Sequence, residues 1–313
     1  MDTVLHIQGS PDSPLRPLIL VHAISGLALP YFALGPLSYP DEDQNLHEGR
    51  PVYGISAPIY EHGSPCAAPG SLFEVAALYV SIVRREIQPK GPYLLGGWSM
   101  GGMIAVEMAA ILTAEGETVQ HVLMIDSLNP AHYLPFQDAR EHHVVATITY
   151  NAIARRMNAP EESASAPLRD EDSSSSSDTS RESSDGEVDS DDDEDVDGSM
   201  IRFYGRLRQH IHHGLRMLSS YRSALPGGER PLLPNTSATL IKCETLGTLS
   251  PLLRERRREF ARKINGDATN GWSAQQFKGF ATVPFRAMHD GCFDEGFADE
   301  LTLILRNVLG RME

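Results

Sequence analysis

The sequence predicts an α/β fold, in which helices cover both faces of a mostly parallel β-sheet. Short apolar runs alternate with longer amphipathic stretches along most of the chain, and this alternation is typical of strand–helix–strand units. The pentapeptide GWSMG at 97–101 follows an apolar run and opens a helical stretch, so a strand turns sharply into a helix there. The chain has 313 residues, of which 41% are hydrophobic, enough for one large core.

The first 130 residues contain most of the predicted sheet. Residues 18–21, LILV, are apolar throughout, as expected of a strand buried on both faces. Ser71 and Glu74 have the spacing of a capping box at the start of a helix, and Gly116 ends the helix that follows the pentapeptide. The predicted strands are residues 3–7, 17–22, 52–56, 92–96 and 122–125, and the predicted helices are 72–88 and 103–114.

The strand pattern stops near residue 130 and resumes near residue 235. Only helical pieces, at 139–157 and 200–218, lie between these points. We therefore predict that residues 1–130 and 235–313 form one core and that 131–234 form a helical lid insertion over the catalytic edge of the sheet. A surface insertion without a role at the site is the alternative. After the insertion, the predicted strands are 238–243 and 281–288, and the predicted helices are 251–264 and 297–309.

A Ser/Asp/Glu tract at 161–199 lies in the middle of the insertion. It holds sixteen acidic residues against two arginines, so it carries −14 of the net charge of −15. Because it has almost no large apolar side chain, it cannot bury enough surface to offset the entropy of ordering, and we predict that it is disordered. The rest of the chain is nearly neutral, which argues against a nucleic-acid-binding surface.

The remaining composition predicts a cytoplasmic protein. The three cysteines, Cys66, Cys243 and Cys292, lack metal-ligand spacing and are too few for a disulfide framework, so thiols in a reducing compartment are expected. The N-terminus is acidic where a signal peptide would be basic, and no apolar run reaches the length of a membrane span. We expect neither a metal nor a cofactor.

Ser99, at the centre of the pentapeptide, is the predicted nucleophile. Gly97 and Gly101 flank it, and glycine permits both the strained turn and the close approach of helix to strand. The helix N-terminus beneath the serine favours developing negative charge. A glycine-rich turn without chemistry is the alternative.

Asp126 and His289 are the predicted partners of Ser99. Each directly follows a predicted strand, and the carboxyl ends of parallel strands meet at one edge of a sheet. Their order along the chain, serine then aspartate then histidine, is that of α/β-hydrolases. A carboxylate capping a loop and an unpartnered loop histidine are the alternatives. Asp290 and Asp294 are weaker candidates for the acid, and the histidines of the predicted lid helices are expected to be solvated or to line a pocket: His142, His143, His210, His212 and His213.

This arrangement predicts acyl transfer. Neutral His289 would take the proton of Ser99 during attack on an acyl carbonyl, and Asp126 would fix the tautomer of the imidazole. The oxyanion needs backbone N–H donors. We expect one from Met100 and the other from Ile24 in the loop that begins at His22, with Ala23 as the alternative to Ile24.

Several segments resemble thioesterase domains of polyketide and nonribosomal peptide synthases, especially fungal ones. They are LVHAISG at 20–26, PYFAL at 30–34, VYGI at 52–55, GPYLLGGWSMGG at 91–102, MIDS at 124–127 and Gly271-Trp272 ahead of His289. The resemblance covers residues 15–130 and 235–310. It implies an α/β-hydrolase fold with a helical lid, a Ser-Asp-His triad, and acyl thioesters presented on the phosphopantetheine arm of an acyl carrier protein or carrier domain. No nucleic acid or membrane is implied as a partner.

The chain departs from the family pattern in two places. Many members have His-Gly or His-Pro where this chain has His22-Ala23, and the acidic tract is not part of the pattern. Because carrier proteins are usually acidic, the tract would repel them, so we expect it to project away from the pocket entrance. The position of the chain ends is compatible with a free-standing enzyme and with an excised terminal domain.

Two other functions remain open at this stage. A carboxylesterase or lipase would use the same residues on oxygen esters. A non-catalytic α/β-hydrolase-like interaction protein would use the acidic tract as a phosphorylated docking segment, although an intact Ser-Asp-His order argues against an inactive scaffold.

Overall fold

A computed structural model of the chain describes residues 2–38, 49–61, 69–163, 192–224 and 232–312. These residues form a seven-stranded sheet in the order β1-β3-β2-β4-β5-β6-β7. Strand β1 pairs antiparallel with β3, and every other pair is parallel, as the sequence predicted. The strands are β1 Val4–Gln8, β2 Leu18–Val21, β3 Val52–Ile55, β4 Tyr93–Trp98, β5 Val119–Ile125, β6 Leu233–Thr245 and β7 Phe277–Met288.

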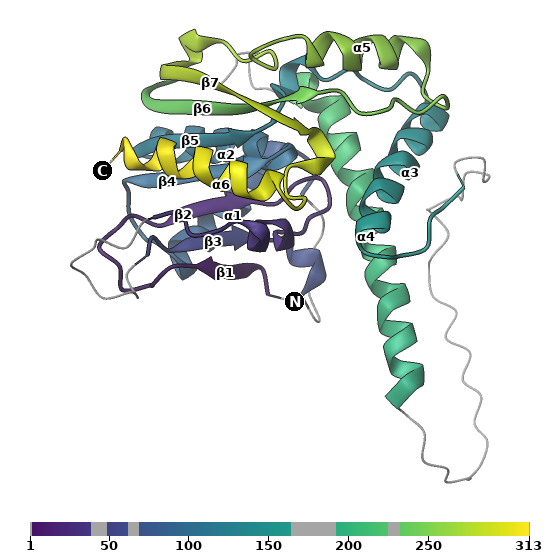
Figure 1. Cartoon of the computed structure of the whole chain (residues 1–313), viewed down its shortest axis with the longest axis horizontal. Helices are drawn as coiled ribbons and strands as arrows, with labels where there is room; N and C mark the ends of the chain where they lie inside the picture. The colour runs from purple at the N-terminus through teal and green to yellow at the C-terminus, as the bar shows by residue number, and fades with distance from the viewer. Residues whose placement is uncertain (1, 39–48, 62–68, 164–191, 225–231, 313) are drawn as a thin grey trace.

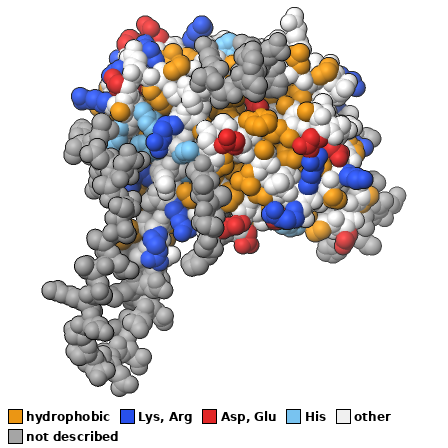
Figure 2. Space-filling model, turned by 180° about the vertical axis from the view of Figure 1, so that it is seen from behind, with side chains coloured by type: hydrophobic (Ala, Val, Ile, Leu, Met, Phe, Trp, Pro, Cys, Tyr) orange, Lys and Arg blue, Asp and Glu red, His pale blue; other side chains and the backbone are white. Residues whose placement is uncertain are grey.

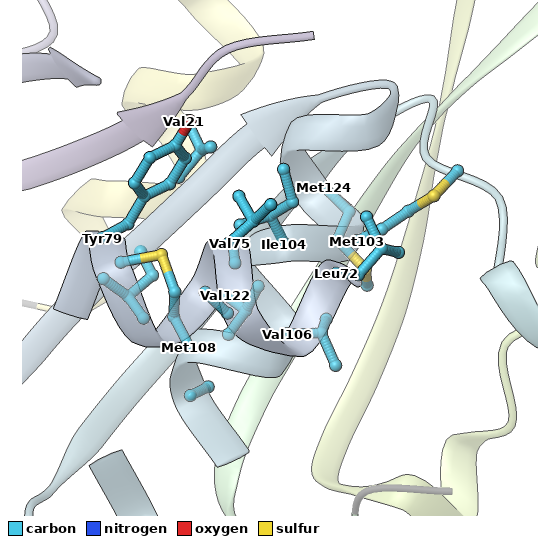
Figure 3. Close-up of a cluster of buried hydrophobic side chains, with 14 of the residues drawn as sticks. Val21, Leu72, Val75, Tyr79, Met103, Ile104, Val106, Met108, Val122 and Met124 are labelled. Atoms are coloured by element: carbon cyan, nitrogen blue, oxygen red, sulfur yellow. The ribbon is translucent and has the colours of Figure 1, made fainter. Parts of the chain in front are cut away.

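Alternate side chains of the central strands enter two separate cores. On β2, Ile19 and Val21 belong to the cluster shared with helices α1 (Leu72–Glu86) and α2 (Met100–Ala114), which Figure 3 shows. Leu18 and Leu20 belong to the second cluster, which is shared with helix α6 (Phe297–Gly310). A strand covered on both faces is therefore apolar at every position, and this explains why the central strands are easy to recognise in the sequence.

The structure extends several predicted elements. Strand β5 begins at Val119, β6 begins at Leu233, and β7 begins at Phe277, where the sequence offers polar residues, proline or glycine. In this region β6 and β7 pair with each other over most of their length, so cross-strand pairing overrides the weak local propensity. Helix α5 (Glu255–Asn265) begins four residues later than predicted.

The insertion contains two helices, α3 (Ala139–Arg156) and α4 (Asp192–Ala224), which we call the insertion helices. Figure 1 shows both at one end of the sheet, with the first turns of α4 projecting beyond the core. The predicted disorder of residues 161–199 was wrong at its C-terminal end, because residues 192–199 belong to α4. Residues 164–191 lie outside the described part of the chain.

The surface outside the acidic tract carries mixed charge. On the described part of the face in Figure 2, acidic and basic side chains are interspersed with apolar ones. Among the described helices, none combines the length and apolar character that crossing a membrane requires.

Candidate active site

Ser99 lies on the sharp turn between β4 and α2. Its backbone has φ 56° and ψ −121°, a region that residues other than glycine rarely adopt. The surrounding backbone leaves no room for a side chain at the two flanking glycine positions. A Cβ on Gly97 would lie 2.4 Å from the carbonyl carbon of Gly101, and one on Gly101 would lie 2.1 Å from the carbonyl oxygen of Val21. The glycine spacing therefore meets a steric requirement, as the nucleophile-elbow prediction assumed.

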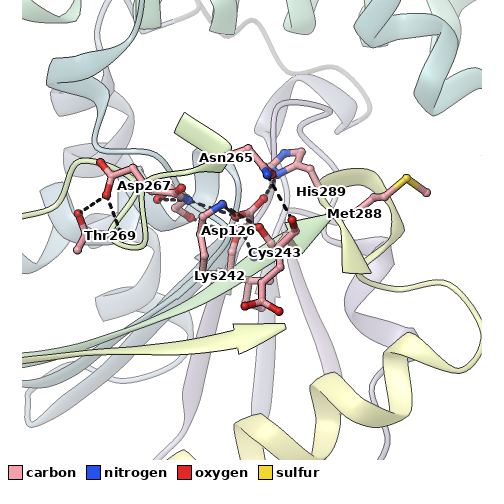
Figure 4. A network of polar contacts seen from close by, with 12 residues as sticks. Asp126, Lys242, Cys243, Asn265, Asp267, Thr269, Met288 and His289 are labelled. Atoms are coloured by element: carbon pink, nitrogen blue, oxygen red, sulfur yellow. Dashed lines mark hydrogen bonds and ion pairs between the residues drawn. The ribbon is translucent and has the colours of Figure 1, made fainter. Parts of the chain in front are cut away.

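The structure brings the three predicted residues into one hydrogen-bonded chain. His289 Nε2 lies 3.0 Å from Ser99 Oγ, and His289 Nδ1 lies 2.7 Å from Asp126 Oδ2. Ser99 follows β4, Asp126 follows β5 and His289 follows β7, so all three lie at the carboxyl edge of the sheet. Figure 4 shows Asp126 beneath the imidazole of His289. This is the geometry in which an imidazole removes a hydroxyl proton and a carboxylate orients the imidazole.

The second oxygen of Asp126 is held by two hydrogen bonds and one ion pair. Oδ1 accepts hydrogen bonds from the Cys243 N–H at 3.2 Å and from Asn270 Nδ2 at 3.1 Å, and Lys242 Nζ lies 3.7 Å away. Burial raises the pKa of Asp126, but the hydrogen bond and charge of His289, with Lys242 and Asn270, bring that pKa below its ordinary value. The carboxylate is therefore ionised and fixed in orientation.

His289 has the raised pKa expected of a histidine paired with a buried carboxylate. Burial lowers its pKa, but the hydrogen bond and charge of Asp126, together with the charge of Asp290, raise it to about 9. The side chain is still 42% exposed, so it is reachable from solvent. Its ring also lies against Trp98, with 5.6 Å between the ring centroids. The imidazole is thus a strong base within reach of a substrate.

The two predicted oxyanion residues, Met100 and Ile24, both lie against Gly214 of α4. Met100 is the first residue of α2, where N–H groups lack partners within the helix. A Cβ on Gly214 of α4 would lie 2.5 Å from Ile24 Cδ1 and 3.3 Å from Met100 Sδ, so both side chains pack beneath this point of the helix. The roles of their N–H groups stay a prediction.

His22 holds the loop that carries Ile24. Its Nδ1 lies 2.6 Å from the Ala23 carbonyl oxygen, and its Nε2 lies 2.5 Å from the Tyr79 hydroxyl. Burial lowers the pKa of His22 to about 4, with a smaller opposing effect from the Ala23 carbonyl. The neutral ring therefore donates to Ala23 and accepts from Tyr79, which ties the loop to α1.

Two residues of the site were missed in the sequence. Lys242 is nearly buried near the end of β6, directly after the apolar pair Leu240 and Ile241. A lysine is costly to bury without a partner, so its position was a usable signal. Asn270 has φ 48°, which asparagine tolerates better than most residues. It directly precedes Gly271-Trp272, and Trp272 Nε1 donates to the Ser127 carbonyl oxygen at 2.8 Å, so this turn supports the Asp126 turn.

The other candidates have different surroundings. Asp294 pairs with Arg156 of α3 at 2.5 Å, and the charge of Asp290 contributes to the raised pKa of His289. His210 is partly buried beside His22, with 5.3 Å between the ring centroids, and desolvation holds its pKa well below 6.5. His213 contacts a different part of the chain, because its Nε2 lies 2.5 Å from the Pro69 carbonyl oxygen. Within the described ranges, no group of three or more His, Cys, Asp or Glu side chains could hold a metal ion.

Proteins similar to this chain over its whole length are fungal thioesterases. The family model for the thioesterase domain matches residues 16–171. Thioesterase pytI of Aspergillus terreus is 55% identical over 310 residues, and thioesterase pynI of Aspergillus niger is 39% identical over 313 residues; each alignment covers 99% of both chains. Non-reducing polyketide synthase PKS16 of Cladonia grayi is 37% identical over 129 residues, which are 41% of this chain and 6% of that protein.

Solved thioesterase structures share the fold. The NocB thioesterase domain, in covalent complex with a fluorophosphonate nocardicin G analog, has a TM-score of 0.59 at 23% identity and covers 98% of this chain and 99% of its own. The RedJ thioesterase from the prodiginine pathway of Streptomyces coelicolor has a TM-score of 0.56 at 15% identity, with 96% and 92% covered. These likenesses, with the sheet order, confirm the predicted α/β-hydrolase fold.

Proposed function

This chain belongs to the thioesterase domain family, and on that premise we propose that it releases a polyketide-like acyl chain from the phosphopantetheine arm of a carrier protein through a Ser99 acyl-enzyme. The enzyme class follows from relatives that are thioesterases over their whole length. The source of the acyl chain is supported by the matches to non-reducing polyketide synthases. The observation that carries the proposed chemistry is the hydrogen-bonded chain from Ser99 through His289 to Asp126.

In the first half-reaction, Ser99 Oγ attacks the thioester carbonyl while its proton passes to His289 Nε2. Asp126 accepts from Nδ1, so Nε2 is the nitrogen left free to act as base, and the carboxylate stabilises the imidazolium that forms. The resulting oxyanion meets the N–H groups of Met100 and Ile24. Each such donor contributes about 3–4 kcal/mol of transition-state stabilisation.

Collapse of the tetrahedral intermediate breaks the carbon–sulfur bond. The imidazolium of His289 returns its proton to the departing sulfur, and the arm leaves as a free thiol with the acyl group on Ser99. In the second half-reaction His289 removes a proton from the incoming nucleophile. Water yields a carboxylic acid, whereas a hydroxyl or carbon nucleophile of the chain itself yields a cyclic product.

The insertion helices form the lid of this site. Support comes from Gly214 of α4, which lies against the side chains of Ile24 and Met100. A helix seated on both predicted oxyanion residues limits the approach of an acyl chain to that side. The insertion therefore selects the substrate, while the sheet edge supplies the reaction.

Turnover of matched substrates tests the proposal. An acyl-S-pantetheine and a p-nitrophenyl ester of the same acyl group are compared for kcat/KM, and candidate acyl carrier proteins are examined by intact mass. We expect preference for the thioester and appearance of acyl-enzyme at Ser99. Preference for the oxygen ester would instead favour a carboxylesterase.

Ser99→Ala is the variant that tests the nucleophile. Loss of the hydroxyl is expected to lower kcat by about 10⁴- to 10⁶-fold and to abolish labelling by a fluorophosphonate. Ser81→Ala is the matched control, because Ser81 is an exposed serine on α1 that donates to the Leu78 carbonyl. Labelling that survives in Ser99→Ala would exclude Ser99 as the nucleophile.

We expect the acidic tract to project away from the pocket entrance, although residues 164–191 of it lie outside the described part of the chain. The first turns of α4 project beyond the core in Figure 1, which supports that placement. Deletion of the tract is expected to leave thioester turnover within a few-fold of the parent. Collapse of activity in a folded deletion variant would contradict it.

A further inference from the structure

Strand β6 places a lysine ammonium against the carboxylate that orients the proposed base. We propose that Lys242 is a positioning residue of this reaction: its buried charge keeps Asp126 ionised and turned toward His289, and thereby allows His289 to act as a base at lower pH. The inference rests on the proposed function, because it gives Lys242 a role only in a reaction that uses these residues.

Lys242 and Asp126 are both removed from solvent. Their side chains are 7% and 10% exposed, and Lys242 Nζ lies 3.7 Å from Asp126 Oδ1. Nζ also donates to the Cys243 carbonyl oxygen at 2.8 Å, so the ammonium is tied to its own strand. Charges with so little water around them interact more strongly than an exposed pair. The neighbouring carboxylate accounts for a buried lysine at this point of β6.

The two oxygens of Asp126 have different partners. Oδ2 faces His289 Nδ1 at 2.7 Å, whereas Oδ1 faces Lys242, the Cys243 N–H and Asn270 Nδ2. Turning the carboxylate would break this set. The Cys243 N–H and Asn270 Nδ2 donate hydrogen bonds to Oδ1, whereas Lys242 contacts it as an ion pair. Lys242 therefore adds an electrostatic preference to a geometry that the two neutral donors already define. Figure 4 shows Lys242 and Cys243 beside Asp126, with His289 across from them.

The sign of the effect on His289 follows from its charged neighbours. Asp126 and Asp290 are anions and favour the imidazolium. Cys243 and Cys292 are buried thiols, and Cys292 Sγ lies 3.2 Å from the His289 carbonyl oxygen. The hydrogen bond with Cys292, together with burial, raises the pKa of Cys243, so the Cys243 thiol stays neutral. Lys242 supplies positive charge on the far side of Asp126. It opposes protonation of the Asp126–His289 pair, whichever of the two holds the proton.

Removing this charge therefore makes the pair more basic. An opposite charge within about 4–6 Å lowers the pKa of a carboxyl group by about one unit or more, and Lys242 Nζ lies 3.7 Å from Asp126 Oδ1. In Lys242→Met, the pH midpoint for reaction at Ser99 is expected to rise by about one unit. On the acid limb the reaction then slows about tenfold, and well above the midpoint it approaches the parent rate.

The test measures the second-order rate of fluorophosphonate labelling from pH 5 to 10, which needs no knowledge of the acyl substrate. Lys242→Arg keeps the positive charge and is expected to keep the parent midpoint. Lys278→Met removes an exposed lysine at the start of β7 and controls for the change in net charge. Lys242→Gln is a second neutral variant whose amide can still donate to the Cys243 carbonyl. Thermal unfolding of each variant verifies the fold.

The outcomes separate this inference from the proposed function. A raised midpoint in both neutral variants, with unchanged midpoints in Lys242→Arg and Lys278→Met, supports the role of Lys242. Equal midpoints in all folded variants overturn it, and so does failure of both neutral variants to fold, since Lys242 would then serve the fold and not the base. Labelling that persists in Ser99→Ala would instead overturn the proposed function.

Discussion

The sheet edge that carries Ser99 and the insertion helices α3 and α4 are built in different ways. At the sheet edge, backbone atoms of β2, β4 and α2 approach so closely that Gly97 and Gly101 have no room for a Cβ. The insertion helices pack through side chains instead. Their shared cluster combines Leu27, Ala57 and Tyr60 of the core with Ala146, Tyr150 and Ala154 of α3 and Leu207, Ile211 and Leu215 of α4.

This difference separates the two tasks of the enzyme. Backbone contacts allow little adjustment, so they hold the reacting groups at fixed distances. Side-chain contacts tolerate hydrophobic replacement at similar volume, so the insertion is free to change its lining while the triad stays in place.

The largest expected effect breaks the backbone contact at the sheet edge. In Gly101→Ala, the new Cβ would lie 2.1 Å from the Val21 carbonyl oxygen, and this atom belongs to the backbone and cannot rotate away. Relief requires separating α2 from β2, which we expect to cost about 3 kcal/mol or more of the free energy of unfolding. Chemical denaturation measures it. Native stability in this variant would show that the edge is more pliable than its contacts imply.

The next effect is a dependence on pH, because the pKa values of His289 at the sheet edge and His210 in the insertion shift in opposite directions. The pKa of His289 is raised to about 9, so kcat/KM is expected to rise about tenfold per pH unit on its acid limb, with a midpoint between 6.5 and 9. The raised pKa of His289 contributes stability that is fully present below pH 6.5 and is lost as pH rises toward 9. A pH–rate profile that is already flat at pH 6 would contradict the assignment of His289.

His210 of α4 shows the opposite sign. Its pKa is lowered by burial, so the neutral ring stabilises the fold above pH 6.5, and this contribution is lost as pH falls. Below pH 6.5 the free energy of unfolding is expected to fall by about 1.4 kcal/mol per pH unit for this group. In His210→Phe that part of the slope should disappear, as measured by denaturation at several pH values, and an unchanged slope would count against it.

A smaller effect concerns the attachment of α4 to the core. The Tyr221 hydroxyl donates to Glu107 Oε1 at 2.5 Å, and Glu107 is nearly buried in α2. Tyr221→Phe leaves that carboxyl without this donor and is expected to cost about 1–3 kcal/mol of unfolding free energy. Tyr53→Phe on β3 is a control away from α4. Equal stability of the two variants in denaturant would show that the bond does not hold the helix.

The smallest effect comes from a glycine without neighbours. A Cβ on Gly205 of α4 would meet no atom within 4 Å. Because glycine within a helix is less favourable than alanine, Gly205→Ala is expected to stabilise the protein by about 0.5–1 kcal/mol, with little change in kcat. The contrast with Gly101→Ala compares one substitution in the two regions. Destabilisation by Gly205→Ala in a thermal melt would mean that this stretch of α4 is more crowded than its surroundings indicate.

The sequence by itself determined the local parts of this protein. Apolar runs such as Leu18–Val21 mark buried parallel strands, because a strand covered on both faces must be apolar at each position. The spacing of Gly97, Ser99 and Gly101 marks the elbow, because only glycine fits beside that turn. The order of Ser99, Asp126 and His289 at strand ends was readable since parallel strands end at a common edge.

Only the tertiary structure decided how distant residues share one carboxylate. Lys242 and Asn270 lie far from Asp126 in the sequence, and their contacts with Oδ1 depend on the register of β5 with β6 and on the turn before Trp272. The helical start of α4 within the acidic tract was likewise missed. The composition of a segment indicates how much surface that segment can bury by itself. Strand pairing and side-chain packing also depend on distant residues, which the local sequence does not identify.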